Sequence, residues 1–171
     1  AVDAAPQEIQ AVIQALQAFR GIQRLSAATI AAEAGSISRF ARAKQLMGYA
    51  GIVSSEDSSG ERRRRGAITK TGNAHLRRIV MEAAWSYRYR PSLSKSLCER
   101  QKGLLPEICE IAWKAQHRLH KRYMTLLLKG KTKQQVVVAV GRELLGFIWD
   151  VGRQVEAAHQ KVTRATARAA A

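Results

Sequence analysis

Four consecutive arginines, Arg62, Arg63, Arg64 and Arg65, constrain the fold of this chain more than any other feature. Burying unpaired charge is expensive, so the run cannot enter a core and must face water or an anionic partner. It lies in a polar stretch, residues 53–78, that concentrates serines, glycines and further basic residues. We predict that this stretch binds phosphate and reacts with it, and that the rest of the chain forms a helical scaffold around it.

The balance of charge indicates the class of partner. The chain carries 29 Lys and Arg against 13 Asp and Glu, a net charge of +16, and phosphate neutralisation supplies much of the affinity of such proteins for nucleic acid. An anionic membrane surface is the alternative, but the basic residues cluster in one stretch and not on one face of an amphipathic helix. Cys98 and Cys109 indicate no disulfide framework, and no apolar run reaches the ~20 residues of a membrane span. We therefore expect a cytoplasmic protein with no membrane partner.

Apolar residues recur at helical spacing along most of the chain and predict an all-α fold. Helices are expected to begin at Pro6 and then to lie at about residues 27–34, 40–47, 73–89, 92–102, 107–129 and from 132 onward. Ser26 and Gly35 are expected to cap the second helix, and Thr71 or Asn73 the fourth. The basic stretch before the fourth helix is expected to be an irregular loop, with at most a short β excursion.

The domain organisation is expected to be simple. We predict one domain over residues 1–160, with a motif-bearing core over 7–90, a helical scaffold over 91–160 and a basic, disordered tail over 161–171. The first two helices, joined at Gly21-Ile22, have the outline of a helix-hairpin-helix, whose turn amides can hold a DNA phosphate. Ordinary packing of a glycine at a helix end is the alternative.

A serine before a glycine, beside guanidinium groups, is suited to attack on phosphorus. Ser58-Ser59-Gly60 has this form: the glycine allows close backbone approach, and the arginines can hold phosphate and stabilise its developing charge. No obvious base adjoins it, and a solvated turn is the alternative. Residues 69–73, before a helix N-terminus, resemble an anion nest. Two histidines one helical turn apart and two separated cysteines do not predict zinc, so we expect no metal in this chain.

Several short motifs, in order, resemble the C-terminal transposase domain of the insertion-sequence family 110, also written 116/902. The resemblance covers residues 7–90 closely and extends more loosely to about Val155. The motifs are Arg20-Gly21-Ile22, Leu25-Ser26-Ala27, Arg39-Phe40, Gln45-Leu46-Met47, Gly48-Tyr49-Ala50-Gly51-Ile52, Ser58-Ser59-Gly60, Arg65-Gly66-Ala67-Ile68-Thr69-Lys70, Gly72-Asn73, Leu76-Arg77-Arg78 and Glu82-Ala83-Ala84-Trp85.

The resemblance implies a DNA recombinase that a structured bridge RNA guides to its donor and target. It implies that an N-terminal, RuvC-like acidic site holding Mg²⁺ acts together with a serine of this domain. Ser59 matches that serine, with Ser58 as the alternative, and would form a phosphoserine link to DNA. Because the chain lacks the acidic domain, we expect no cofactor in it and no activity of the isolated fragment.

The remaining site residues follow from the same resemblance and from their charge. Phosphate contacts are expected from the four arginines, Lys70 and Asn73, and backbone contacts with DNA or RNA from Arg77 and Arg78. The expected setting is the bacterial nucleoid, with a homo-oligomer in the full-length assembly. A non-catalytic helical nucleic-acid-binding module is the alternative function.

Overall fold

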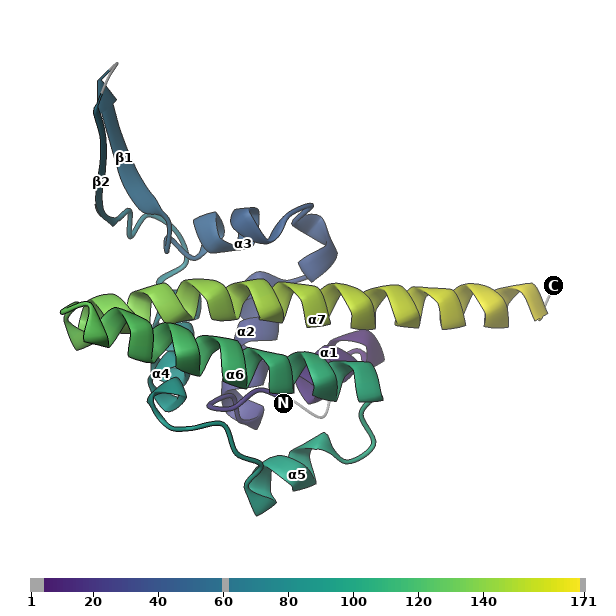
Figure 1. Ribbon diagram of the computed structural model, residues 1–171. Helices are drawn as coiled ribbons and strands as arrows, with labels where there is room; N and C mark the ends of the chain where they lie inside the picture. The colour runs from purple at the N-terminus through teal and green to yellow at the C-terminus, as the bar shows by residue number, and fades with distance from the viewer. Residues whose placement is uncertain (1–4, 60–61, 170–171) are drawn as a thin grey trace.

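The computed structural model describes residues 5–59 and 62–169, with side chains described outside residues 55–65 and 169. Over this range the chain is predominantly helical, which confirms the predicted all-α fold (Figure 1). The elements in order are α1 (Gln7–Leu16), α2 (Arg24–Ala34), the 3-10 helix η2 (Ile37–Arg39), α3 (Ala43–Tyr49), β1 (Ser54–Ser59), β2 (Arg62–Ile68), α4 (Ala74–Ala84), the 3-10 helix η3 (Trp85–Arg88), α5 (Lys95–Gln101), α6 (Pro106–Leu128) and α7 (Lys133–Ala169).

Helix α7 is the centre of the molecule. Helices α1, α3, α4, α6 and η2 all pack against it, so it joins both ends of the chain in one core (Figure 1). The apolar stripe predicted along this helix is buried throughout: Val136, Val140, Leu144, Ile148, Val151 and Val155. The stripe repeats every three or four residues, and burial of such a face supplies most of the stability of a helix in a globular protein.

A buried carboxylate fixes η2 to α7. Glu156 is only 3 % exposed. It accepts hydrogen bonds from the backbone N–H groups of Ile37, at 2.6 Å, and Ser38, at 2.7 Å, and from the hydroxyls of Ser36 and Ser38. A negative charge is favourable at this place because the first N–H groups of a helix have no partner within it. The loop before α3 is thereby tied to a residue of the last helix.

The caps of the N-terminal helices were predicted with mixed success. Gly35 does end α2, with a positive φ of 62°. Ser26 is not the N-cap, because α2 already begins at Arg24 and Gln23 is the extended residue before it. Ile22 is fully buried, so the packing of the preceding turn, rather than a capping side chain, decides where this helix starts.

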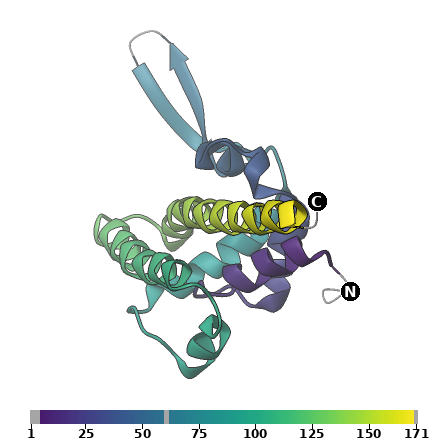
Figure 2. The same cartoon turned by 90° about the vertical axis from the view of Figure 1, so that its right-hand side faces the viewer.

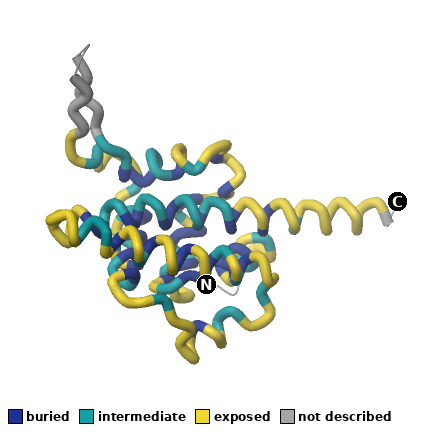
Figure 3. Tube along the Cα trace, in the orientation of Figure 1, coloured by how far each residue is buried: buried dark blue, intermediate teal, exposed yellow. Residues whose placement is uncertain are grey.

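The basic C-terminal segment is helical and not disordered over residues 161–169. Helix α7 continues to Ala169 and projects beyond the other helices, where its side chains are exposed (Figure 3). Alanine has the highest helix propensity, and extending a helix that is already nucleated costs little. These two effects account for the difference from the predicted tail.

The central basic stretch forms an antiparallel β-hairpin, which corrects the prediction of an irregular loop. Strands β1 and β2 pair with Glu56 opposite Arg65 and Asp57 opposite Arg64. A search for apolar alternation does not detect strands as polar as these. The hairpin projects away from the helical body on the α3 side (Figures 1 and 2).

Candidate nucleic-acid interface

The root of the hairpin is held by backbone contacts between its two arms. Lys70 N donates to Gly51 O at 3.2 Å, and Asn73 N donates to Tyr49 O at 2.7 Å. Gly72 has a φ of 128°, and a Cβ atom there would overlap the Tyr49 carbonyl. The hairpin therefore leaves the helical body in a fixed direction, set by close approach of the chain at its base.

The register of the hairpin places the serines opposite the arginines. Ser59 pairs with Arg62, and Ser58 pairs with Arg63, at the end of the hairpin away from its root. Gly60 and the side chains of residues 55–65, which include Ser59 and the four arginines, lie outside the described part of the structure. The backbone nevertheless brings the predicted nucleophile and the predicted phosphate-binding run to neighbouring positions.

Lys70 and Asn73 were both predicted to contact phosphate, and the structure places them differently. Lys70 is exposed beside the hairpin root, with a positive φ of 55°. Asn73, one of the two predicted candidates, is the N-cap of α4: its Oδ1 accepts from Leu76 N at 2.8 Å. Its Nδ2 donates to Glu33 Oε2 at 2.5 Å. Both ends of the Asn73 amide are therefore engaged within the protein.

The two basic residues at the start of α4 also differ. Arg77 is half-buried and donates from Nη1 to the Ala50 carbonyl at 3.0 Å, at the end of α3. Arg78 is exposed and pairs with Glu82 at 2.9 Å, one helical turn away. Exposed pairs of this kind contribute little to stability, so Arg78 can exchange its partner for a phosphate at low cost. Arg77 instead supports the hairpin root.

Sequence reasoning missed a polar cluster that joins α2 to the hairpin root. Tyr49 donates its hydroxyl to the Glu33 carbonyl at 3.0 Å, and His75 Nδ1 lies 2.9 Å from Glu33 Oε1. Hydrogen bonds from Asn73 and then His75 lower the pKa of the Glu33 carboxyl. Hydrogen bonds from Asn73 and then Arg39 lower the pKa of the Tyr49 hydroxyl. Nothing local in the sequence marks Glu33 as a partner of residues 40 positions later.

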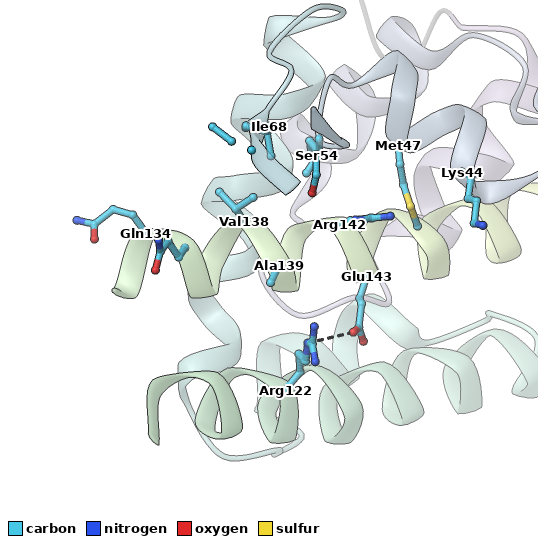
Figure 4. A pocket seen from close by; sticks show the side chains of 14 residues that line it. Lys44, Met47, Ser54, Ile68, Arg122, Gln134, Val138, Ala139, Arg142 and Glu143 are labelled. Carbon is cyan, nitrogen blue, oxygen red and sulfur yellow. Dashed lines mark ion pairs between the residues drawn. The ribbon is translucent and has the colours of Figure 1, made fainter. Parts of the chain in front are cut away.

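A groove of about 880 Å³ lies between the hairpin root, α3, α6 and α7 (Figure 4). Three cationic side chains line it, Lys44, Arg122 and Arg142, together with the acidic Glu143. Arg118 and Arg122 share that carboxylate, at 3.0 and 3.3 Å, so the surroundings of the groove remain net positive. Each of these residues looks like an isolated surface charge in the sequence, and only the fold brings them together. The floor is apolar and includes Met47, Ile52, Ile68, Val138 and Ala139.

Two classes of site are absent from the part of the chain that the structure describes. No three His, Cys, Asp or Glu side chains there gather into a cluster that could hold a metal ion. No described helix combines the length and apolar character that a membrane crossing needs.

Comparison with known proteins gives a consistent result. The family described as Transposase IS116/IS110/IS902 matches residues 13–99, which include the hairpin and its root. The chain is 44 % identical over 146 residues to the putative transposase y4qE of Sinorhizobium fredii, an alignment that covers 85 % of this chain and 37 % of that protein. It is 36 % identical over 72 residues to a probable family 20 transposase of Pseudomonas aeruginosa, covering 42 % of this chain and 21 % of the relative.

A third relative is the transposase for insertion sequence element IS1111A of Coxiella burnetii, 34 % identical over 71 residues, or 42 % of this chain and 20 % of that protein. The chain therefore aligns with only 20–37 % of the length of these relatives. The match to more than half of its residues shows that the chain belongs to the IS116/IS110/IS902 transposase family.

Proposed function

We propose that this chain is the serine-bearing, nucleic-acid-binding part of a transposase that cuts and rejoins DNA, with Ser59 as the nucleophile. The observation that carries the proposal is the hairpin register, which sets Ser59 opposite Arg62 within the segment matched by the transposase family. A projecting hairpin with a fixed root can reach a DNA strand while the helical body stays in place.

In the proposed reaction, the serine carries out a transesterification. The Ser59 hydroxyl attacks a backbone phosphorus and loses its proton to a base, while the bond from phosphorus to one sugar oxygen breaks and that oxygen takes up a proton. The product is a DNA–phosphoserine diester, and attack by another DNA hydroxyl reverses the step and frees the serine. Arginines beside the reacting phosphate would stabilise its extra negative charge.

A serine hydroxyl is a weak nucleophile near neutral pH, so it needs a base or a metal ion. The described residues do not fit a Mg²⁺ site, since no cluster of potential ligands occurs among them. In this proposal the acidic, Mg²⁺-binding site belongs to another part of a longer protein, which agrees with the limited share of its relatives that this chain spans.

The basic groove at the hairpin root suits a nucleic-acid backbone. Lys44, Arg122 and Arg142 can contact successive phosphates, and the apolar floor can accept sugar surfaces. We assign this groove to the DNA that the hairpin cuts or to the structured guide RNA paired with it. Homo-oligomerisation completes the proposal, because strand exchange requires more than one cut strand.

The decisive experiment replaces each serine in the full-length transposase. Ser59→Ala should abolish strand exchange and the protein–DNA covalent adduct while leaving DNA binding intact, because the change removes one hydroxyl and leaves the backbone of the hairpin unaltered. Ser58→Ala should have the milder effect. Normal recombination by Ser59→Ala with loss in Ser58→Ala would move the nucleophile by one residue. Normal recombination by both would exclude the serine mechanism and favour a non-catalytic binding module.

The phosphate-binding role of the arginines has its own test. Duplex affinity should fall steeply with salt, with a log–log slope of roughly −0.9 per phosphate neutralised. Replacing Arg62 to Arg65 by alanine should make this slope shallower by up to about 3.6. A slope that does not change would show that the four arginines do not face DNA.

A further inference from the structure

A second basic site lies on the side of α7 opposite the hairpin (Figures 1 and 2). There Pro91 and one face of α6 enclose an open hollow of about 580 Å³, and the α6 residues that line it are Lys114, His117, Arg118, His120 and Lys121. None of the described residues lining the hollow is acidic. The hollow shares no lining residue with the groove at the hairpin root, and only the ion pair of Arg118 with Glu143 connects the two.

The hollow is built by the packing of η3 onto α6. His120 Nδ1 donates to the Tyr87 carbonyl at 3.1 Å. Arg20 donates from Nη1 to the Arg90 carbonyl at 2.7 Å and from Nη2 to the Ser92 hydroxyl at 3.0 Å. His120 thus joins η3 to α6, and Arg20 joins the segment around Pro91 to the turn between α1 and α2. The cationic side chains consequently border a preformed concave surface.

An aromatic side chain stands at the edge of the hollow. Trp113 is 39 % exposed, so part of its indole is open to solvent. Its ring meets the His117 ring edge-on, with centroids 4.5 Å apart, and His117 also lines the hollow. The packing with His117 holds the indole beside the basic residues instead of against the core.

We infer that this hollow binds an unpaired nucleic-acid strand. Lys114 and Lys121 can contact phosphates, and Arg118 can exchange its ion pair with Glu143 for a phosphate. An exposed indole adds a platform on which a base can stack, and bases are available for stacking only where they are not paired. An acidic protein surface would use the charges but would leave Trp113 without a role. The inference does not depend on the serine chemistry or on the hairpin.

The test compares two substitutions of Trp113 in binding to labelled 12-nucleotide oligo-rU, oligo-dT and a 12-base-pair DNA duplex, measured by fluorescence anisotropy. Trp113→Leu removes the stacking surface and should weaken binding of the unpaired strands about 5- to 150-fold. Trp113→Phe keeps an aromatic ring and should retain most of the affinity. Duplex binding should change little in either variant. Tighter binding of oligo-rU than of oligo-dT would identify RNA as the ligand. Equal binding would show that the hollow accepts unpaired RNA and unpaired DNA alike.

A second pair of variants tests the charges without touching the indole. Lys114→Gln with Lys121→Gln should make the salt slope for oligo-dT shallower by about 1.4, at roughly 0.7 per phosphate on single strands. Lys161→Gln with Arg168→Gln removes the same charge from the projecting end of α7 and should leave that slope unchanged. Three results would overturn the inference. The first is an affinity for unpaired strands that Trp113→Leu leaves unchanged. The second is a loss of that affinity in Trp113→Phe as large as in Trp113→Leu. The third is a loss of duplex binding in Trp113→Leu as large as its loss of binding to unpaired strands. Circular dichroism confirms that each variant is folded.

Discussion

Replacing Glu156 by glutamine should destabilise the protein far more than removing any surface carboxylate. The two carboxylate oxygens each accept a backbone N–H, from Ile37 at 2.6 Å and from Ser38 at 2.7 Å, in surroundings that leave the residue 3 % exposed. Glutamine keeps one acceptor oxygen and presents an NH₂ group to the other N–H. That donor then faces a second donor and has no partner.

The magnitude follows from these contacts. A hydrogen bond to a charged group contributes about 1.5–3 kcal/mol, and a buried donor left without a partner costs about 1–3 kcal/mol. We therefore expect Glu156→Gln to lower the free energy of unfolding by about 2–3 kcal/mol and Glu156→Ala, which orphans both N–H groups, by about 3–5 kcal/mol. For a chain of this size, a loss of 2 kcal/mol lowers Tm by about 4–8 °C.

Urea unfolding at pH 7, followed by circular dichroism, measures the effect. Glu82→Gln is the matched control, because Glu82 pairs with Arg78 at 2.9 Å but its side chain is 62 % exposed. Exposed ion pairs contribute about 0–1 kcal/mol to stability, so Glu82→Gln should change the free energy of unfolding very little. If Glu156→Gln costs no more than Glu82→Gln, the carboxylate does not anchor the 3-10 helix and our account of this contact is wrong.

Three further predictions concern the hairpin root. Gly72→Ala should lower the free energy of unfolding in urea by about 1–3 kcal/mol, because the φ of 128° and the overlap with the Tyr49 carbonyl both oppose a side chain. Gly35→Ala is the control and should cost less, since a Cβ atom there meets nothing within 4 Å. An equal cost of the two changes would refute the close-approach argument. Asn73→Ala should cost about 1 kcal/mol, the usual loss for an N-cap, without changing the salt slope of duplex binding; a shallower slope would restore its predicted phosphate contact. The hydrogen bond from Asn73 lowers the pKa of the Glu33 carboxyl in the folded protein. The ionised carboxylate therefore adds its full stability at pH values above the pKa that Glu33 has in the unfolded chain. This stability is lost as the pH falls through the lower pKa of the folded protein. The difference in stability between the wild type and Glu33→Gln should therefore shrink in acid unfolding below about pH 4, and a difference that grows there would contradict the assignment.

Local signals in the sequence predicted those features that local interactions determine. The apolar stripe of α7 could be predicted because its period is that of a helix, and Asn73 could be identified as a cap because a cap acts within three residues of itself. The hairpin could not be predicted in this way. Its strands are polar, so they show no apolar alternation, and its root is closed by Gly72 against a carbonyl 23 residues earlier in the chain.

Roles that depend on contacts between residues far apart in the sequence could not be predicted, because such contacts leave no local signal. Arg77 was predicted to contact nucleic acid from its charge and position, and nothing in the sequence indicated that its guanidinium also donates to the carbonyl of Ala50, the residue after α3 and 27 positions earlier. The partners Glu33 and Asn73 are 40 residues apart, and Ile37 and Glu156 are 119 residues apart. The groove likewise joins Lys44 to Arg142, which no window of sequence contains together. The candidate site was thus located from its composition, but the surface around it came only from the fold.

The central position of α7 also determines when the protein can fold during synthesis. Helix α1 packs on α2 and also on a helix that begins at Lys133, so the part of its apolar face that α7 covers stays exposed until more than 110 further residues have been made. At about 5–20 residues per second, this delay lasts roughly 6–25 s on the ribosome. Until then the nascent chain is open to chaperones and proteases. A product that terminates before α7 lacks the element on which the core closes, and we expect the cell to degrade it instead of accumulating a folded fragment.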